Sequence, residues 1–542
     1  MAGGDGTAPA CVAEVERRPD PTSVVLGCRL AQIHGRPLLR PFGCVWIACL
    51  AAALAVTGAA FPLHAEGWLA DRGGRLEIVP AANGDRIPDF SAAGYGTPGA
   101  ALPVVAEAVR LAPQPDAGDR AAIQAAIDAV SARPLPSSGV RGAIVLAPGT
   151  YRLDGPLQIS ASGVVLRGSG SGDGGTVLSF EQPPGPVISI EGAGRWRAAE
   201  EPRAIVDAYV PVGAEAVTLE SADGLSVGDR VIVQRPFTAA FVAEIGMDQI
   251  PPRAGRTTVQ WKPGRGLLMA RTIVSVTGDT IGLDAPVIDA IEAADGGTVW
   301  RYTFPGEITG VGLENLSIDG TPAAPRAPVP FKDLRTLRLA GIRMDKVSDA
   351  WVRDVRFRNL SSYVIVYALA REITIEDVHG RNDLPPWWPV PAFAFSVDGQ
   401  RTLVRRCSVE ADNMLVATTQ SRAAGPIVFQ DCEGQGPRVG AGPHQRWAAG
   451  ILFDNIDVSG SIAIVDRGNM GSGQGWAGAN VVVWNSTADR GFHVASPPTA
   501  YTWVIGATGE VLPDPDHPPV VLPLPSGAPR SLYDAQVSGA IP

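Results

Sequence analysis

The residues best suited to chemistry gather in the stretch Gly442–Asn480, in a chain otherwise rich in Ala, Gly, Val and Pro. An imidazole can accept a proton near neutral pH, and a guanidinium binds a carboxylate in a bidentate fork. We therefore take His444 as the candidate general base, and Arg446 and Arg467 as candidates for binding a substrate carboxylate. This combination suits β-elimination from a uronic acid, in which a base removes a proton that the neutralised carboxylate has made acidic. The side chains expected to bind the sugar are Trp388, Trp387, Tyr363, Trp447, Asn469, Trp476 and His493.

A repeat in the C-terminal half predicts how these residues are positioned. From Gly310 on, short apolar segments recur at intervals of roughly 20–40 residues, and they can be aligned so that one residue of each occupies the same position in the repeat. The equivalent positions are Asn315, Asp354, Asp377, Arg406, Asp431, Asn455, Asn485 and Gly506. Asn, Asp and Gly tolerate a left-handed turn, and short apolar strands ending in such turns are typical of a β-solenoid. The predicted fold class is all-β, a parallel β-helix, with a β-sandwich as the alternative.

The apolar residue after each turn position is predicted to point into the solenoid. These residues are Leu316, Val355, Val378, Cys407, Cys432 and Ile456. Adjacent coils lie about 4.8 Å apart, so the two cysteines, which are one repeat apart in the sequence, should be neighbours in the interior. We predict a pair of buried thiols, with a disulfide as the alternative.

Residues at a similar offset beyond each turn should stack on one face of the solenoid. The candidates are Tyr363, Trp388, Thr418, His444, Arg467 and His493. Each follows the previous one by about one coil, so the sequence predicts an aromatic, imidazole and guanidinium stripe along the long axis. Such a stripe would offer an extended polysaccharide a complementary surface.

The N-terminal part carries a helix signal and a family resemblance. Within Asp116–Val130, apolar residues recur at helical spacing behind Asp119, a candidate N-cap. The segments GDRAAIQAAIDAV, RGAIVLAPGTY and SGVVLRGSG resemble the opening of pectate-lyase-superfamily proteins, in particular the rhamnogalacturonase/epimerase-like group. The resemblance implies a right-handed parallel β-helix whose open end is capped by the helix.

The resemblance also bears on the choice of chemistry. Polygalacturonase-type hydrolases of this superfamily carry Asn-Thr-Asp, Asp-Asp and Gly-His-Gly signatures, which the repeat region lacks. A secreted polysaccharide lyase is therefore favoured. A glycoside hydrolase, which needs two carboxyl groups, and a non-catalytic polysaccharide-binding adhesin are the alternatives. The carboxyl candidates are Asp398, Glu410, Asp412 and Asp466. The clustered acidic residues that calcium-dependent pectate lyases use are also absent, so no cofactor is expected and Ca²⁺ has no support in the sequence.

The overall composition limits the kinds of partner that the protein can bind, and the N-terminal segment indicates its cellular compartment. With 45% hydrophobic and 18% charged residues, the chain can bury a large core. Its net charge of -10 argues against a nucleic-acid partner. Basic residues precede the apolar segment Cys44–Leu63, which ends in small residues near Ala65, as in a secretory signal. We expect a secreted or periplasmic protein that contacts the membrane only if this segment remains as a signal anchor.

The expected organisation has five parts. Residues 1–65 form the signal and 66–184 the capping helix and first coils. Residues 185–305 alternate like antiparallel strands and form a small inserted β subdomain. We favour core or turn roles for its Trp261 and Arg265, with a position near the substrate as the alternative. Residues 306–510 form the main coils, and 511–542 form a tail that runs along the outside or caps the last coil.

Overall fold

The computed structural model describes residues 67–541, apart from 74, 115–117, 182–184, 324–338 and 384–391. The export segment and the pair Trp387 and Trp388 lie outside the described residues, so these expectations stay predictions. No helix within the described ranges is long and apolar enough to cross a membrane.

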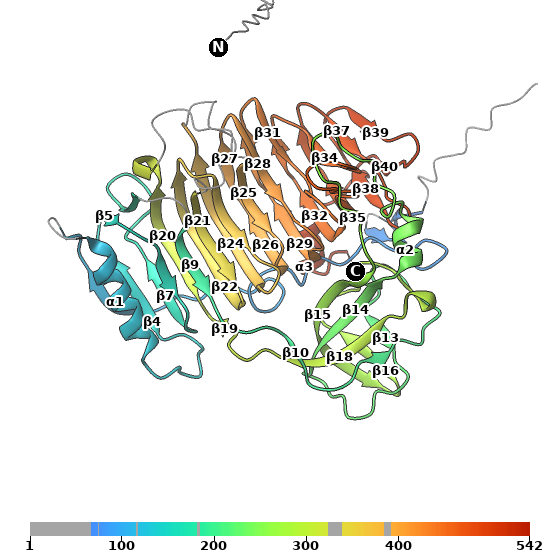
Figure 1. Ribbon diagram of the computed structural model, residues 1–542, viewed down its shortest axis with the longest axis horizontal. Coiled ribbons are helices and arrows are strands. Elements are labelled where there is room, and N and C mark those ends of the chain that lie inside the picture. Colours follow the sequence, from blue (N-terminus) through green and yellow to red (C-terminus); the bar gives the residue numbers. More distant parts are fainter. Residues whose placement is uncertain are drawn as a thin grey trace, which may run out of the picture. The chain divides into compact units, whose positions relative to one another are not determined.

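The chain folds into a right-handed parallel β-helix, as predicted (Figure 1). Neighbouring strands in its two large sheets run parallel, which excludes an antiparallel sandwich. The nineteen-stranded sheet consists of β3 (Glu107–Leu111), β4 (Gly142–Leu146), β5 (Gly149–Leu153), β7 (Val164–Arg167), β8 (Thr176–Phe180), β19 (Ile308–Thr309), β20 (Gly312–Asp319), β22 (Val347–Arg358), β24 (Arg371–Arg381), β26 (Gln400–Arg405), β27 (Ser408–Glu410), β29 (Ala424–Gln430), β30 (Glu433–Gln435), β32 (Ala448–Asp454), β33 (Asp457–Val458), β35 (Gly478–Trp484), β36 (Thr487–Ala488), β38 (Thr502–Ile505) and β40 (Val520–Leu522). The ten-stranded sheet consists of β6 (Leu157–Ile159), β9 (Gly185–Glu191), β21 (Leu339–Asp345), β23 (Ser362–Val366), β25 (Ala392–Val397), β28 (Asn413–Thr418), β31 (Arg438–Ala441), β34 (Ile462–Ile464), β37 (Phe492–Val494) and β39 (Val511–Pro513).

The nineteen-stranded sheet bends at the predicted turn position and so has two arms. We call the strand segments before the bend, such as β26, the first arm, and those after it, such as β27, the second arm. All eight predicted turn residues have left-handed backbone, with φ between 47° and 69°, which confirms the register of the repeat. Asn485 Nδ2 also donates to Asn455 Oδ1 at 2.7 Å, so these two adjacent turns are tied together.

The interior between the sheets is apolar, as the repeat predicted. Each of the six residues expected to follow a turn and point inward is at most 1% exposed. Cys407 and Cys432 are both buried free thiols, which confirms the thiol prediction over the disulfide. Burial is the main cause of the raised pKa of Cys407, and the neighbouring Cys432 adds to it.

Helix α1 (Asp119–Ser131) caps the N-terminal end of the solenoid beside β4 and β7 (Figure 1). The prediction of Asp119 as N-cap is wrong, because Gly118 holds that position and Asp119 is the first helical residue. The Asp119 carboxylate instead accepts from the backbone N–H groups of Gln114 and Arg152, and so ties the helix to the first coils. The apolar face of the helix is buried at the predicted positions, Ile123, Ile127 and Val130.

The insertion after β9 forms a seven-stranded antiparallel sheet. Its strands are β10 (Arg197–Ala198), β11 (Arg203–Ala204), β13 (Ala216–Thr218), β14 (Arg230–Phe237), β15 (Gly264–Thr277), β16 (Thr280–Leu283) and β18 (Thr298–Thr303), accompanied by α2 (Ala239–Glu244), the pair β12 (Tyr209–Val210) and β17 (Ile291–Glu292), and a short 3-10 turn at Ala293–Asp295. Buried polar bonds join it to the first arm. The fully buried Arg271 donates to Gly425 O at 3.0 Å, and Gln400 Oε1 accepts from Ala270 N at 2.8 Å. The insertion is therefore docked on the solenoid by specific contacts.

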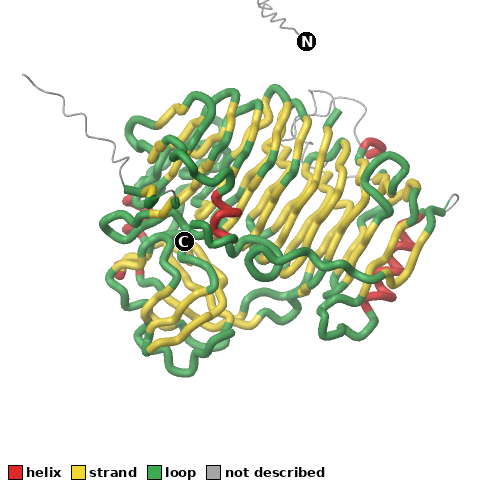
Figure 2. Tube along the Cα trace, turned by 180° about the vertical axis from the view of Figure 1, so that it is seen from behind, coloured by secondary structure: helices red, strands yellow, loops and turns green. Residues whose placement is uncertain are grey.

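Segments from both ends of the described chain cover the outer face of the first arm. The C-terminal helix α3 (Leu532–Val537) lies across its strands (Figure 2). Asp454, which is fully buried, accepts from Ser531 Oγ at 2.7 Å and from Tyr533 N at 2.9 Å, and the Tyr533 hydroxyl donates to Ala93 O. This cover explains why β29, β32 and β35 are buried at every position. The remaining described elements are the hairpin β1 (Leu69–Asp71) and β2 (Leu76–Ile78) and a 3-10 turn at Thr321–Ala323.

Candidate functional site

Turns that lead from the ten-stranded sheet into the first arm bring together one polar side chain from each of four coils. Gln420 N donates to Asp398 Oδ1 at 2.6 Å, and Gln420 Oε1 lies 2.8 Å from His444 Nδ1. On the other side of the ring, His444 Nε2 lies 3.3 Å from Gln474 Nε2. We call Asp398, Gln420, His444 and Gln474 the edge ladder. The predicted base thus belongs to a chain of polar contacts along the solenoid axis.

The partners of His444 define which ring nitrogen carries its proton. A Gln side-chain oxygen only accepts hydrogen bonds, so His444 Nδ1 donates to Gln420. Arg467 Nε donates to Gln474 Oε1 at 2.7 Å, which directs the Gln474 amide NH₂ at His444 Nε2. When the imidazole is neutral, this network places its lone pair on Nε2. The contact between Gln474 and Nε2 is long for a hydrogen bond, so Gln474 engages that lone pair only weakly.

Three guanidinium groups adjoin the edge ladder, and none forms an ion pair with a carboxylate of the described residues. Arg422 N donates to Arg446 O, and Arg446 N donates to Gln474 O, so these residues stack on successive coils. Arg446 Nε and Nη2 contact only neutral groups, and Arg467 bonds Gln474. Burial lowers the pKa of Arg467, and burial together with the Arg446 charge lowers the pKa of Arg422. Uncompensated positive charge in a chain of net charge -10 suits an anionic ligand.

Three aromatic residues predicted to bind sugar are core residues instead. Tyr363 lies inside the solenoid, where its ring stacks on Phe357 at a centroid distance of 5.0 Å. Trp447 is fully buried under the insertion, and its Nε1 donates to Asp289 Oδ2 at 2.9 Å. Trp476 is 3% exposed, and its Nε1 also donates into the insertion. The sugar-binding prediction is wrong for these three, because the solenoid interior encloses Tyr363 and the docked insertion covers the two indoles.

The predicted solvent-facing stripe is also wrong in part. Thr418 is fully buried, like Tyr363, and cannot meet a ligand. His493 is exposed in β37, but its register partner in β34 is Ala463 rather than a ladder residue. Asn469 Nδ2 contacts Pro252 O of the insertion at 3.3 Å. The stripe fails because loops of unequal length break a constant offset, whereas His444 and Arg467 do meet, through Gln474.

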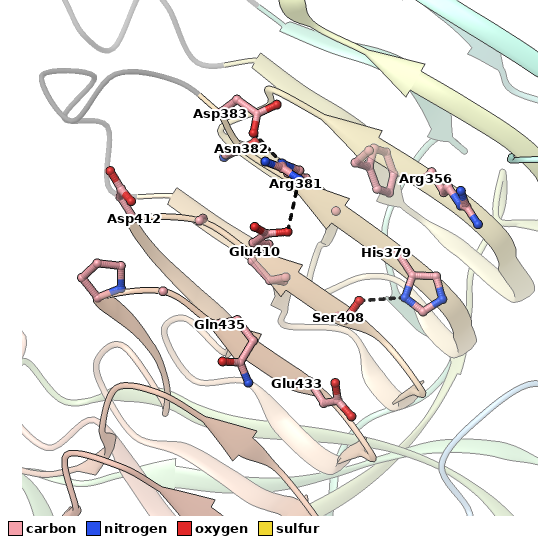
Figure 3. A pocket seen from close by; sticks show the side chains of 16 residues that line it. Arg356, His379, Arg381, Asn382, Asp383, Ser408, Glu410, Asp412, Glu433 and Gln435 are labelled. Atoms are coloured by element: carbon pink, nitrogen blue, oxygen red, sulfur yellow. Dashed lines mark hydrogen bonds and ion pairs between the residues drawn. The ribbon is translucent and has the colours of Figure 1, made fainter. Parts of the chain in front are cut away.

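A groove of about 1140 Å³ lies over the outer face of the second arm (Figure 3). Its floor comes from β24, β27 and β30. His379 Nδ1 lies 2.8 Å from Ser408 Oγ, and Arg381 forms ion pairs with Asp383 and Glu410 (Figure 3). The acidic residues Asp412 and Glu433 also line the groove, so carboxylates outnumber guanidiniums there.

The four carboxyl groups that the sequence offered for a hydrolase do not lie together in one site. Glu410 and Asp412 line the groove, Asp398 belongs to the edge ladder, and Asp466 accepts from Gly468 N within its own turn. Sequence reasoning missed Glu433. The register pairs Ser408 with Glu433 and Glu410 with Gln435. The two glutamates are therefore diagonal neighbours, whose Cα atoms lie about 8 Å apart from the strand spacing and the rise per residue. Counting residues beyond the turn position in successive coils would have found this pair.

A smaller cavity of about 330 Å³ lies where the insertion meets the solenoid, and we call it the junction pocket. Its polar and aromatic lining consists of Arg195, Trp196, Arg265, Trp300, Asp398, Gln400, Ser421 and Arg422. Asp398 is shared with the edge ladder. Burial raises the pKa of Asp398 to about 7, although the Gln420 N–H bond favours the charged form. Trp261, by contrast, is 6% exposed and packs in the core of the insertion.

Within the described ranges, no group of three or more His, Cys, Asp or Glu side chains is placed to hold a metal ion.

Comparison with known proteins gives only distant structural likenesses. No protein-family model and no curated protein matches the sequence. A tailspike protein of Pseudomonas phage LKA1 is 11% identical over 75% of this chain and 71% of its own, with a TM-score of 0.36. A tailspike protein of E. coli bacteriophage HK620 is 10% identical, with 76% and 63% covered and a TM-score of 0.36. An alginate lyase from Paenibacillus is 9% identical, with 77% and 98% covered and a TM-score of 0.35. These matches assign neither an activity nor a residue to this chain.

Proposed function

We propose that the protein is a polysaccharide lyase that cleaves a uronic-acid-containing polysaccharide by β-elimination at the edge ladder. One observation carries the proposal. His444, with its Nε2 lone pair defined by the network, adjoins guanidinium groups that have no carboxylate partner among the described residues. A neutral base beside uncompensated positive charge is what removal of a proton next to a bound carboxylate requires.

The residues divide the chemistry between them. Arg446 and Arg467 bind the uronate carboxylate, which withdraws electrons from the adjacent C5–H bond. His444 Nε2 takes the C5 proton when substrate displaces the long contact with Gln474. The C5–H electrons form the C4–C5 double bond, the C4–O bond breaks, and the departing oxygen takes a proton from water. The imidazolium then returns its proton to solvent.

A glycoside hydrolase acting in the groove is the second candidate. The diagonal pair Glu410 and Glu433 favours it. Two carboxyl side chains from neighbouring coils of one groove are the minimum that a glycoside hydrolase requires. The excess of carboxylates in the groove suits a neutral glycan better than an anionic one.

One experiment separates the two candidates. The full-length protein is assayed on uronate and neutral polysaccharides, and the ultraviolet absorbance of unsaturated product is followed separately from new reducing ends. His444→Ala should lower kcat by about 10²–10⁴-fold, with little change in Tm. His444→Gln, which keeps an amide in the ladder, should be as inactive.

The matched variant Glu433→Gln should leave the elimination unchanged. Reducing ends without unsaturated product, lost in Glu433→Gln and kept in His444→Ala, would establish the hydrolase instead. Normal unsaturated-product formation by His444→Ala would also overturn the assignment of the base.

A further inference from the structure

The walls of the junction pocket are held in place by buried contacts between the insertion and the solenoid. Gln400 Oε1 accepts from Ala270 N, while Gln400 Nε2 donates to Leu268 O at 2.8 Å. Arg271 reaches across from β15 to Gly425 O. The pocket is therefore formed before any ligand arrives, which lowers the cost of ordering its side chains on binding.

The insertion wall offers an aromatic surface with an unused donor. Trp196 and Trp300 both pack near Tyr302, with ring-centroid distances of 5.9 Å and 6.4 Å. Trp196 Nε1 is buried and has no hydrogen-bond partner among the described residues. A buried indole N–H without a partner costs free energy, so a small shift of the ring that brings Nε1 to a ligand acceptor would recover it. Indole faces also suit the C–H faces of pyranose rings.

The charges of the pocket favour an anion. Arg195 and Arg265 of the insertion are exposed, and no carboxylate of the described residues pairs with either of them or with Arg422. Among the described residues, four other arginines of the insertion do form ion pairs, namely Arg203, Arg230, Arg235 and Arg301. Guanidinium groups bind carboxylates in a planar fork, and a mixed aromatic and cationic lining therefore suits a sugar acid.

The junction pocket and the proposed catalytic base both lie along the edge ladder. Asp398 lines the pocket and accepts from Gln420 N, and Gln420 bonds His444. Asp398 and His444 are therefore about two coils, roughly 10 Å, apart along the axis. A polysaccharide chain lying along the edge ladder with one uronate at His444 would place a neighbouring residue at the pocket.

We propose that the junction pocket is a sugar-acid-binding subsite that the insertion completes, with Arg265 and Arg422 binding a uronate carboxylate and Trp196 stacking on the ring. This inference rests on the proposed function for the direction of the chain, but it concerns binding rather than proton removal. It gives the insertion a role in substrate recognition, and the turns of the solenoid alone would bind an acidic chain less tightly.

Titration calorimetry with full-length protein tests the subsite. Tetra-galacturonate, tetra-mannuronate and tetra-guluronate are titrated separately into His444→Ala protein, so that ligand is not consumed, and cello-tetraose serves as the neutral probe. Adding Arg265→Ala should weaken binding of at least one tetra-uronate about ten-fold, as expected for one lost charge-assisted contact. Trp196→Phe, which keeps the packing near Tyr302 but removes Nε1, should weaken it several-fold.

The matched control is Arg152→Ala, an exposed arginine at the far end of the solenoid on β5, which should bind like the parent. Equal affinities for the Arg265, Trp196 and Arg152 variants would overturn the subsite, as would cello-tetraose binding with the same dependence on Arg265. Failure of every tetra-uronate to bind would overturn it as well. The turnover of His444→Ala, measured before the titrations, tests the proposed function separately from these affinities.

Discussion

At the scale of single residues, Gln474 connects the two groups that the sequence singled out. Its Oε1 accepts from Arg467, and its NH₂ faces His444. A neutral amide at this position offers the guanidinium no negative partner and adds no charge that would favour protonation of the imidazole. A carboxylate would reverse both effects, because it would pair with Arg467 and stabilise the imidazolium.

We therefore expect Gln474→Glu to lower kcat/KM for unsaturated-product formation at least ten-fold. General-base catalysis contributes roughly 10²–10⁴-fold to the rate, and a protonated imidazole cannot act as the base. Gln445→Glu adds the same charge in the loop that carries His444, at a side chain that donates to Gln420. The kcat/KM of Gln445→Glu should therefore fall much less than that of Gln474→Glu. Equal losses in the two variants would attribute the effect to general charge rather than to the ladder.

At the scale of elements, the left-handed turn between the two arms sets the register of every coil. Asn455 illustrates the requirement, with φ of 54° and a side-chain oxygen that accepts from Asn485 at 2.7 Å. A β-branched residue is strained in this conformation by about 1–2 kcal/mol, and the lost hydrogen bond adds about 0.5–1.5 kcal/mol. Glycine avoids the strain and loses only the bond.

Asn455→Val should accordingly destabilise the protein by about 2–3 kcal/mol, and Asn455→Gly by clearly less. Urea midpoints with unchanged m-values would measure the difference. If valine and glycine proved equally costly, the turn would owe its preference to the side-chain bond and not to backbone conformation.

At the scale of the whole described chain, Asp454 ties the C-terminal helix to the first arm. Burial raises the pKa of this carboxyl to about 7, against the opposing effect of its bonds from Ser531 and Tyr533. The folded state thus retains a proton that an unfolded aspartate releases near pH 4. The stability that this proton contributes is complete below about pH 4 and is lost as pH rises through about 7.

We expect the unfolding free energy of the wild type to fall relative to that of Asp454→Asn between about pH 4 and 7, by up to ~1.4 kcal/mol per pH unit. Urea unfolding of both proteins at several pH values in this interval measures the difference between their unfolding free energies. Parallel pH profiles for wild type and Asp454→Asn would contradict the raised pKa.

The sequence by itself determined the coil register, because left-handed turn residues and inward apolar residues are local requirements that recur in every coil. It also singled out His444 and Arg467 as candidates, because their polar side chains stand out among small residues. Only the tertiary structure decided that Trp447 and Trp476 are core residues, since the insertion groups that accept their indole N–H bonds lie far away in the chain. The same docking creates the junction pocket, and register between coils creates the diagonal pair Glu410 and Glu433. Contacts between distant segments depend on loop lengths and on packing of whole elements, which no local pattern encodes.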